Sequence, residues 1–168
     1  MTIKAIETRY KGYRFRSRLE ARWAVFFDAF PLKWEYEPEG FDLGAEGYYL
    51  PDFYLPEMDM WVEVKPDVSL INGERDKIEV LAAMTGKQVL LAKGTPALRN
   101  YDICYPETLY MDGQGPWEEV CFCEKYLPPR NHDSTPRLFL SPGGDLADCV
   151  LQVEAARSAR FEHGEVPV

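Results

Sequence analysis

Three charged residues in two short apolar segments have the types and spacing for metal-assisted hydrolysis. Asp52 is the only charge within Tyr48–Leu55, and Glu63 and Lys65 stand in the next segment, Met60–Lys65. Both segments are rich in aromatic and aliphatic residues and predict β-strands, with a short turn sequence between them. If the strands pair as a hairpin, Asp52 lies beside Glu63. Two carboxylates and an ammonium then crowd one small apolar area.

Such a cluster needs a compensating cation. Neighbouring carboxylates repel each other, and burial disfavours their charged forms. A hard divalent ion takes oxygen ligands from one or two carboxylates and fills its other positions with water and phosphate. Glu63 and Lys65 share a strand face because side chains alternate along a strand, so Lys65 is expected to point at water on an ion held by Asp52 and Glu63. The alternative interpretation is a surface cluster of ion pairs on a hairpin.

A further acid lies in a predicted helix upstream of these strands. Ser17 followed by Glu20 matches a capping box, and large apolar residues follow at helical spacing until Pro31. On a helical projection Glu20 falls inside the apolar arc. A carboxylate on the core side of a helix needs a partner, whether a backbone N–H, a lysine or a metal. The alternative is that Glu20 only caps the helix.

The elements around these residues predict an α/β fold. A strand is expected at Lys33–Pro38, before the loop 40–47 and the hairpin, and a helix at Glu74–Thr85, with Ile78, Leu81 and Met84 inward and Gly86 as its stop. Lys87–Lys93 reads as a strand covered on both faces. The order is therefore helix, three strands, helix, strand, and the second helix is long enough to make the last two strands parallel.

The rest of the chain predicts a smaller α+β extension. Short strands are expected at Tyr101–Tyr105, Trp117–Cys123 and Arg137–Leu140, and Asp145 is a candidate cap for a helix reaching Arg160. At 168 residues the chain fits a single domain. Residues 13–94 would form its core and residues 95–168 the extension.

Charge is distributed unevenly along the chain. The formal net charge is −9, yet residues 1–34 hold eight Lys/Arg against three Asp/Glu. The arginines expected to contact DNA phosphates are Arg14, Arg16, Arg18 and Arg22, since local potential rather than net charge sets phosphate affinity. The alternative is a solvated basic N-terminus paired with the acidic remainder. No apolar run predicts a membrane span or a signal peptide, and four cysteines in a chain of this length fit the reducing cytoplasm.

These features together resemble a known superfamily. Pro51-Asp52 is followed, after ten residues, by Glu63-Val64-Lys65. With the αβββαβ order, this pattern resembles the restriction-endonuclease-like core of the PD-(D/E)XK nucleases, which has a mixed central sheet flanked by helices. Glu20, in RSRLEARW, matches the acid often seen in the first helix. The resemblance covers residues 13–94, and YRFRSRLEARW followed by a PDF strand also resembles small phage- or mobile-element-encoded nicking and junction-resolving endonucleases.

The resemblance implies hydrolysis of DNA phosphodiester bonds. Asp52, Glu63 and the carbonyl of Val64 would ligate Mg²⁺ or Mn²⁺, and Glu20 would support the site directly or through water. Lys65 would orient the attacking water and help to deprotonate it. A homodimer is a further expectation, because cutting both strands takes two sites.

Two alternatives to this reading remain open. Cys121, Cys123 and His132, with Cys104 or Cys149, could supply four zinc ligands, although Cys-x-Cys is not a strong zinc pattern and the cysteines could simply be core residues. The chain could also be a noncatalytic module that keeps the nuclease fold to bind nucleic acid or to occlude a DNA-binding protein.

Overall fold

The computed structural model describes residues 6–30, 32–67, 73–99, 101–106, 115–125, 137–141 and 149–161. Within these residues the fold is mixed α/β, with three α-helices and a seven-stranded mixed sheet of order β11-β10-β9-β8-β7-β6-β3. The strands of this sheet are β3 (Glu35–Tyr36), β6 (Phe53–Leu55), β7 (Met60–Lys65), β8 (Gln88–Lys93), β9 (Tyr101–Cys104), β10 (Trp117–Lys125) and β11 (Arg137–Ser141). Two small antiparallel sheets are formed by β1 (Thr8–Tyr10) with β2 (Tyr13–Phe15), and by β4 (Phe41–Asp42) with β5 (Tyr48–Tyr49).

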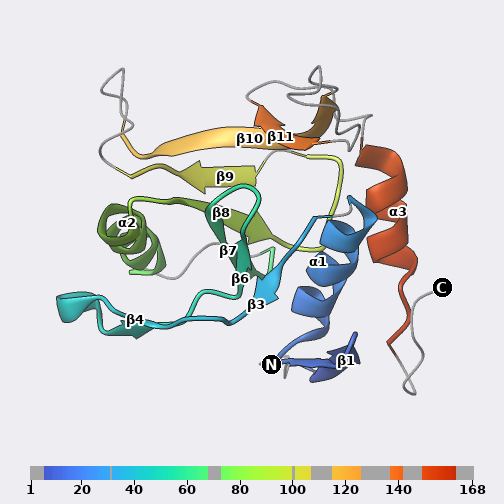
Figure 1. Ribbon diagram of the computed structural model, residues 1–168, viewed down its shortest axis with the longest axis horizontal. Coiled ribbons are helices and arrows are strands. Elements are labelled where there is room, and N and C mark those ends of the chain that lie inside the picture. The colour runs from blue at the N-terminus through green and yellow to red at the C-terminus, as the bar shows by residue number, and fades with distance from the viewer. Residues whose placement is uncertain are drawn as a thin grey trace.

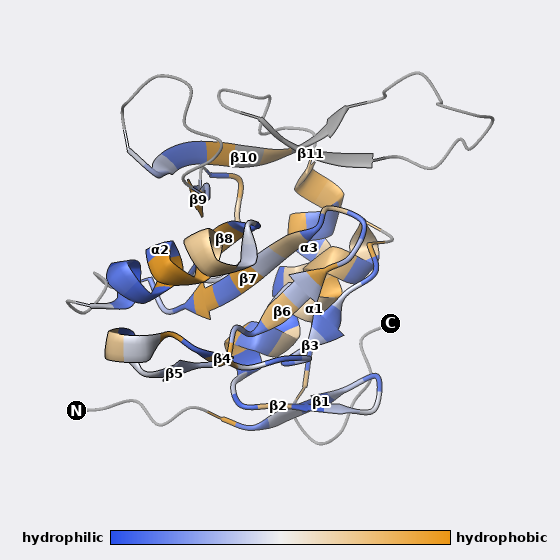
Figure 2. Cartoon of the chain, turned by 60° about the vertical axis from the view of Figure 1, so that its left-hand side comes forward, coloured by the Kyte–Doolittle hydropathy of each residue, from blue (hydrophilic) through white to orange (hydrophobic). Residues whose placement is uncertain are grey.

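The helices cover both faces of the main sheet (Figure 1). α1 (Arg18–Ala29) and α3 (Val150–Ser158) lie side by side against one face, and α2 (Glu74–Thr85) lies against the other. Each face has its own apolar cluster, and apolar residues line the strands β7 and β8 between them (Figure 2). No described helix has the length and hydropathy of a membrane-spanning segment.

Strand directions follow from the connections. β6 and β7 are joined by a tight turn and pair antiparallel, whereas β7 and β8 are parallel and linked through α2. The predicted parallel pairing is thus confirmed. β8 is covered by helices on both faces, which explains its continuous apolar sequence.

The helix predictions hold in most respects. The Ser17 hydroxyl accepts the Glu20 N–H at the N-cap of α1, as the capping box predicts. α2 has the predicted bounds, with Ile78 and Leu81 buried, but the prediction that Met84 faces inward is wrong, since it is 50% exposed. The predicted cap Asp145 lies outside the described residues.

One expected strand is broken in two. The segment Tyr48–Leu55 was expected to be continuous, but β5 pairs with β4 while β6 starts only at Phe53 and pairs with β7. Pro51 accounts for the break, because proline has no N–H for the ladder. The expected loop 40–47 likewise contains β4 and a short 3₁₀ turn, Gly44–Glu46.

Candidate active site

Asp52 and Glu63 lie opposite each other where β6 begins. Phe53 is paired with Val62, and continuing this antiparallel register by one residue sets Asp52 across from Glu63. The Asp52 carboxylate accepts a hydrogen bond from the Val64 N–H at 2.7 Å. Both acids are buried, with 9% of Asp52 and 4% of Glu63 exposed. The hairpin therefore brings the two predicted carboxylates together inside the protein.

Burial makes both carboxylates difficult to ionise. It raises the pKa of Asp52 well above its ordinary value, and the nearby Glu63 and Glu20 carboxylates raise it further. The Val64 N–H and Lys65 only partly oppose this shift. Burial likewise raises the pKa of Glu63, although Lys65 acts in the opposite direction. A cation placed between the two acids would relieve both penalties.

Lys65 bridges two acids from different elements. Its Nζ lies 2.8 Å from Glu63 Oε1 and 3.1 Å from Glu74 Oε1, at the start of α2. Burial alone would lower the pKa of Lys65, but Glu63 and Glu74 outweigh it and raise that pKa. Lys65 is therefore an ammonium at neutral pH. The second oxygen of Glu63, Oε2, is buried and has no hydrogen-bond partner.

Glu20 is held by three donors from its own surroundings. Its carboxylate accepts hydrogen bonds from the Tyr36 hydroxyl at 2.6 Å, the Ser17 hydroxyl at 2.5 Å and the Arg16 N–H at 3.1 Å. Burial and this carboxylate raise the pKa of Tyr36. Glu20 is only 8% exposed, so it both caps α1 and faces inward. It acts on Asp52 through its charge.

Sequence reasoning missed Glu74, Tyr36 and Tyr49 as neighbours of the site. Glu74 could have been found from its place at the start of the helix that follows the Lys65 strand. Burial and the nearby Glu63 carboxylate raise the pKa of the Tyr49 hydroxyl. Neither tyrosine carries a signal in the sequence that separates it from an ordinary strand residue.

The atoms of Asp52 and Glu63 that could bind an ion are oxygens, which suit a hard cation. The buried Glu63 Oε2 has no hydrogen-bond partner and could therefore bind the ion. Within a strand the N–H and C=O of one residue point to the same side. The Val64 carbonyl therefore faces the side where its N–H binds Asp52. The described residues contain no group of three or more His, Cys, Asp or Glu arranged to hold an ion, so the candidate set is two carboxylates and a carbonyl.

The predicted DNA-binding arginines have different surroundings. Arg14 pairs with Glu7, with its Nε at 3.0 Å, and Arg16 pairs with Glu37 at 2.8 Å; both arginines are largely exposed. Arg22 instead donates to the carbonyls of Ala156 and Arg157 near the end of α3. The structure thus gives Arg22 a structural role, while Arg14 and Arg16 remain at the surface.

The predicted zinc ligands are only partly described. Cys104 and Cys149 are buried, and they belong to the apolar clusters on opposite faces of the sheet. The side chains of Cys121 and Cys123, and all of His132, lie outside the described residues.

Comparison of the chain with protein-family models, with curated proteins and with solved structures finds no match. Any functional assignment therefore depends on the geometry of the site.

Proposed function

We propose that the chain is a metal-dependent endonuclease that hydrolyses DNA phosphodiester bonds, built on a restriction-endonuclease-like core. The observation that carries this proposal is the pairing of two buried carboxylates beside a lysine. Asp52 is fixed to the Val64 N–H, and Glu63 has an unpartnered buried oxygen. The order α1, β3, β6, β7, α2, β8 supports the αβββαβ core.

Three groups would bind the metal, and a fourth would act on it through charge. Asp52, Glu63 and the Val64 carbonyl would hold Mg²⁺ or Mn²⁺. The bound ion supplies a Lewis acid that activates water and offsets charge on the scissile phosphate. Glu20 accepts hydrogen bonds from three protein donors, contributes negative charge near Asp52, and would support the site through water.

Lys65 serves as the cation closest to the reacting groups. Its ammonium orients the attacking water and stabilises charge on the phosphate oxygens. Because Glu63 and Glu74 raise its pKa, Lys65 is protonated; it could accept a proton from that water only after its ion pairs loosen and its own proton passes to solvent. Glu63 would loosen its ion pair when it turns toward the metal.

A cleavage assay tests the proposal. Supercoiled plasmid and branched DNA are incubated with wild type, Asp52→Ala and Lys65→Ala, in Mg²⁺ or Mn²⁺. Wild type is expected to nick or cut, and each variant to lose at least about 100-fold in rate, the usual cost of removing a group that stabilises the transition state. Asp76→Ala is the matched control, since Asp76 is an exposed acid of α2. A wild type inert on every substrate, or variants as fast as the control, contradicts the proposal.

One observation favours a noncatalytic module as the second candidate. Lys65 already balances Glu63 and Glu74 without any ion. Such a module would bind DNA by its exposed arginines and cut nothing. Wild type that shifts DNA in a gel but leaves it intact with either metal identifies this case.

A further inference from the structure

A cleft of about 390 Å³ opens beside the candidate active site, where β7 and β8 end. Leu19, Pro66 and Gly94 form part of its wall. Pro66 directly follows Lys65, Leu19 directly precedes Glu20, and the Gly94 N–H donates to the Lys65 carbonyl at 2.7 Å. The wall of the cleft is therefore continuous with the elements that position two of the site residues.

The charged lining of this cleft is mainly basic. Arg99 and Arg157 line it together with one acid, Asp67. Asp67 holds Arg99 in an ion pair at 2.7 Å, and the Lys93 carbonyl accepts a second hydrogen bond from Arg99. Arg157 is exposed and forms no ion pair with a carboxylate in the part of the chain that the structure describes. One guanidinium in the lining is thus left for an anion from outside.

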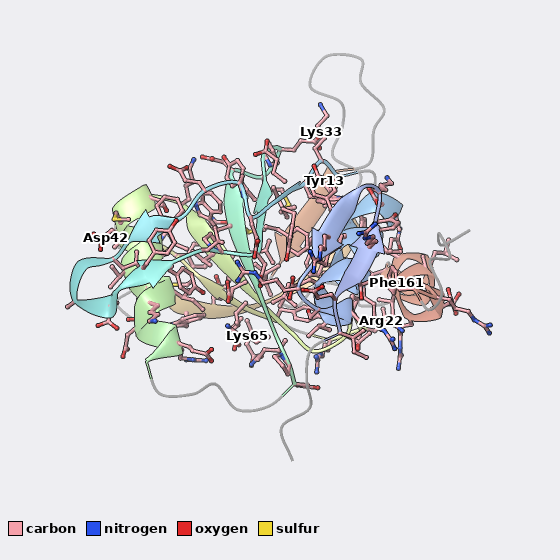
Figure 3. The ribbon with its side chains drawn as sticks, turned by 90° about the horizontal axis from the view of Figure 1, so that it is seen from below. Tyr13, Arg22, Lys33, Asp42, Lys65 and Phe161 are labelled. Atoms are coloured by element: carbon pink, nitrogen blue, oxygen red, sulfur yellow. The ribbon has the colours of Figure 1, made fainter. Side chains whose placement is uncertain are left out.

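Further arginines surround Arg157. Arg22 donates to the backbone carbonyls of Ala156 and Arg157 at 2.8 and 2.7 Å, which fixes this end of α3 against α1. Burial lowers the pKa of Arg22, and so do the nearby charges of Arg18 and Arg157. Figure 3 labels Arg22 and Lys65 in the lower half of that view.

Arg18, Arg22 and Arg157 thus lie close together, and Arg99 lines the same cleft, although the chain has a net charge of −9. Like charges held together repel, and a bound polyanion removes the repulsion. Guanidinium groups match phosphate oxygens with paired, charge-assisted hydrogen bonds. The cleft has room for such a group, and its wall adjoins Lys65 and Glu20 along the chain.

We propose that this cleft binds a DNA phosphate that flanks the scissile phosphate, with Arg157 as its main contact. The inference rests on the proposed function for the identity of the ligand. It also assigns a role to the C-terminal extension, because Arg99 and Arg157 of that extension supply the cations of a cleft whose wall includes residues 19, 66, 67 and 94 of the core.

DNA binding by Arg157→Ala, with Arg160→Ala as the matched control, tests this site. Arg160 is also exposed and follows the same helix, but it does not line the cleft. Affinity for a fluorescein-labelled 20-base-pair duplex is measured by anisotropy in EDTA, at 50 and 200 mM KCl. Losing one phosphate contact removes about 0.9 from the salt slope, so Arg157→Ala should bind about 15-fold more weakly at 50 mM and about 4-fold more weakly at 200 mM. Arg160→Ala should stay near wild type.

Cleavage measured in parallel separates this inference from the proposed function. If wild type fails to cut but Arg157→Ala still shows the salt-dependent loss, the phosphate site stands and the catalytic proposal fails. If wild type cuts and Arg157→Ala binds like wild type at both salt concentrations, or no worse than Arg160→Ala, the phosphate site is overturned alone.

Discussion

Replacing Lys65 by methionine should show how much the stability of the protein depends on a cation beside the carboxylates of Glu63 and Glu74. Removing one partner of a buried ion pair costs about 3–5 kcal/mol. The Lys65 side chain is 27% exposed and that of Glu63 only 5%, so solvent screens part of the interaction. We therefore expect Lys65→Met to lose about 2–3 kcal/mol at pH 7 in EDTA. For a chain of this size that loss lowers Tm by about 4–12 °C.

The stability lost in Lys65→Met should become smaller as pH falls. Burial raises the folded-state pKa of Glu63, and Lys65 is the main influence opposing it, so Lys65→Met raises that pKa further. The cost of the unpaired carboxylate is full above the folded-state pKa and absent below the unfolded value of about 4.3. Melting curves between pH 7 and pH 4 should therefore show the deficit shrinking as pH falls.

Two comparison variants complete this experiment. Glu63→Gln/Lys65→Met should recover most of the lost stability, because a neutral glutamine needs no cation. Lys93→Met breaks a similar pair, Lys93–Asp102 at 2.7 Å, on the strand next to Lys65, and neither residue is a candidate ion ligand. Mg²⁺ at ten times its Kd should add about 1.4 kcal/mol to wild type and to Lys93→Met, but nothing to the double variant. The reasoning is refuted if Lys65→Met melts within about 1 °C of wild type at pH 7 in EDTA.

The remaining predictions concern Asp52 and Ser17. Because the folded-state pKa of Asp52 is raised, its ionised form costs stability above that pKa and not below the unfolded value of about 3.9. Asp52→Asn should therefore stabilise the protein by about 1–2 kcal/mol at pH 7 without metal, with the gain vanishing near pH 4; urea unfolding measures this, and a less stable variant at pH 7 contradicts it. Ser17→Ala removes the N-cap of α1 and a partner of Glu20, and should cost about 1 kcal/mol. Ser158→Ala, at an exposed hydroxyl of α3, is its control, and equal Tm values for the two variants would argue against the cap.

Local sequence patterns were sufficient to predict most of the secondary structure of the core. The capping box located the start of α1, periodicity and Gly86 bounded α2, and the hairpin register followed from the turn between two apolar segments. Each of these signals depends on residues close together in the chain. That is why the approach of Asp52 to Glu63, eleven positions apart along one hairpin, could be predicted.

Contacts between distant segments could not be read in this way. The Lys65–Glu74 pair depends on how α2 packs against β7, and the Arg22 bonds to α3 join residues more than 130 positions apart. Arg22 was expected to contact DNA because it lies in a basic stretch, but composition does not distinguish a surface arginine from one bonded to a helix end. The same limit hid Tyr36, whose hydroxyl reaches Glu20 from another element.

The break in the predicted strand also explains the geometry of the site. Pro51 ends the ladder just before β6. Asp52 then accepts hydrogen bonds from two separate segments, one through its backbone carbonyl and one through its side chain. Its carbonyl accepts the Glu37 N–H at 2.9 Å, and its carboxylate accepts the Val64 N–H at 2.7 Å. The carboxylate thus takes the place of a backbone acceptor beside β7. Because the backbone N–H groups of Val64 in β7 and of Glu37, just after β3, both bind Asp52, the protein itself sets the orientation of Asp52 toward Glu63, as a preorganised site requires.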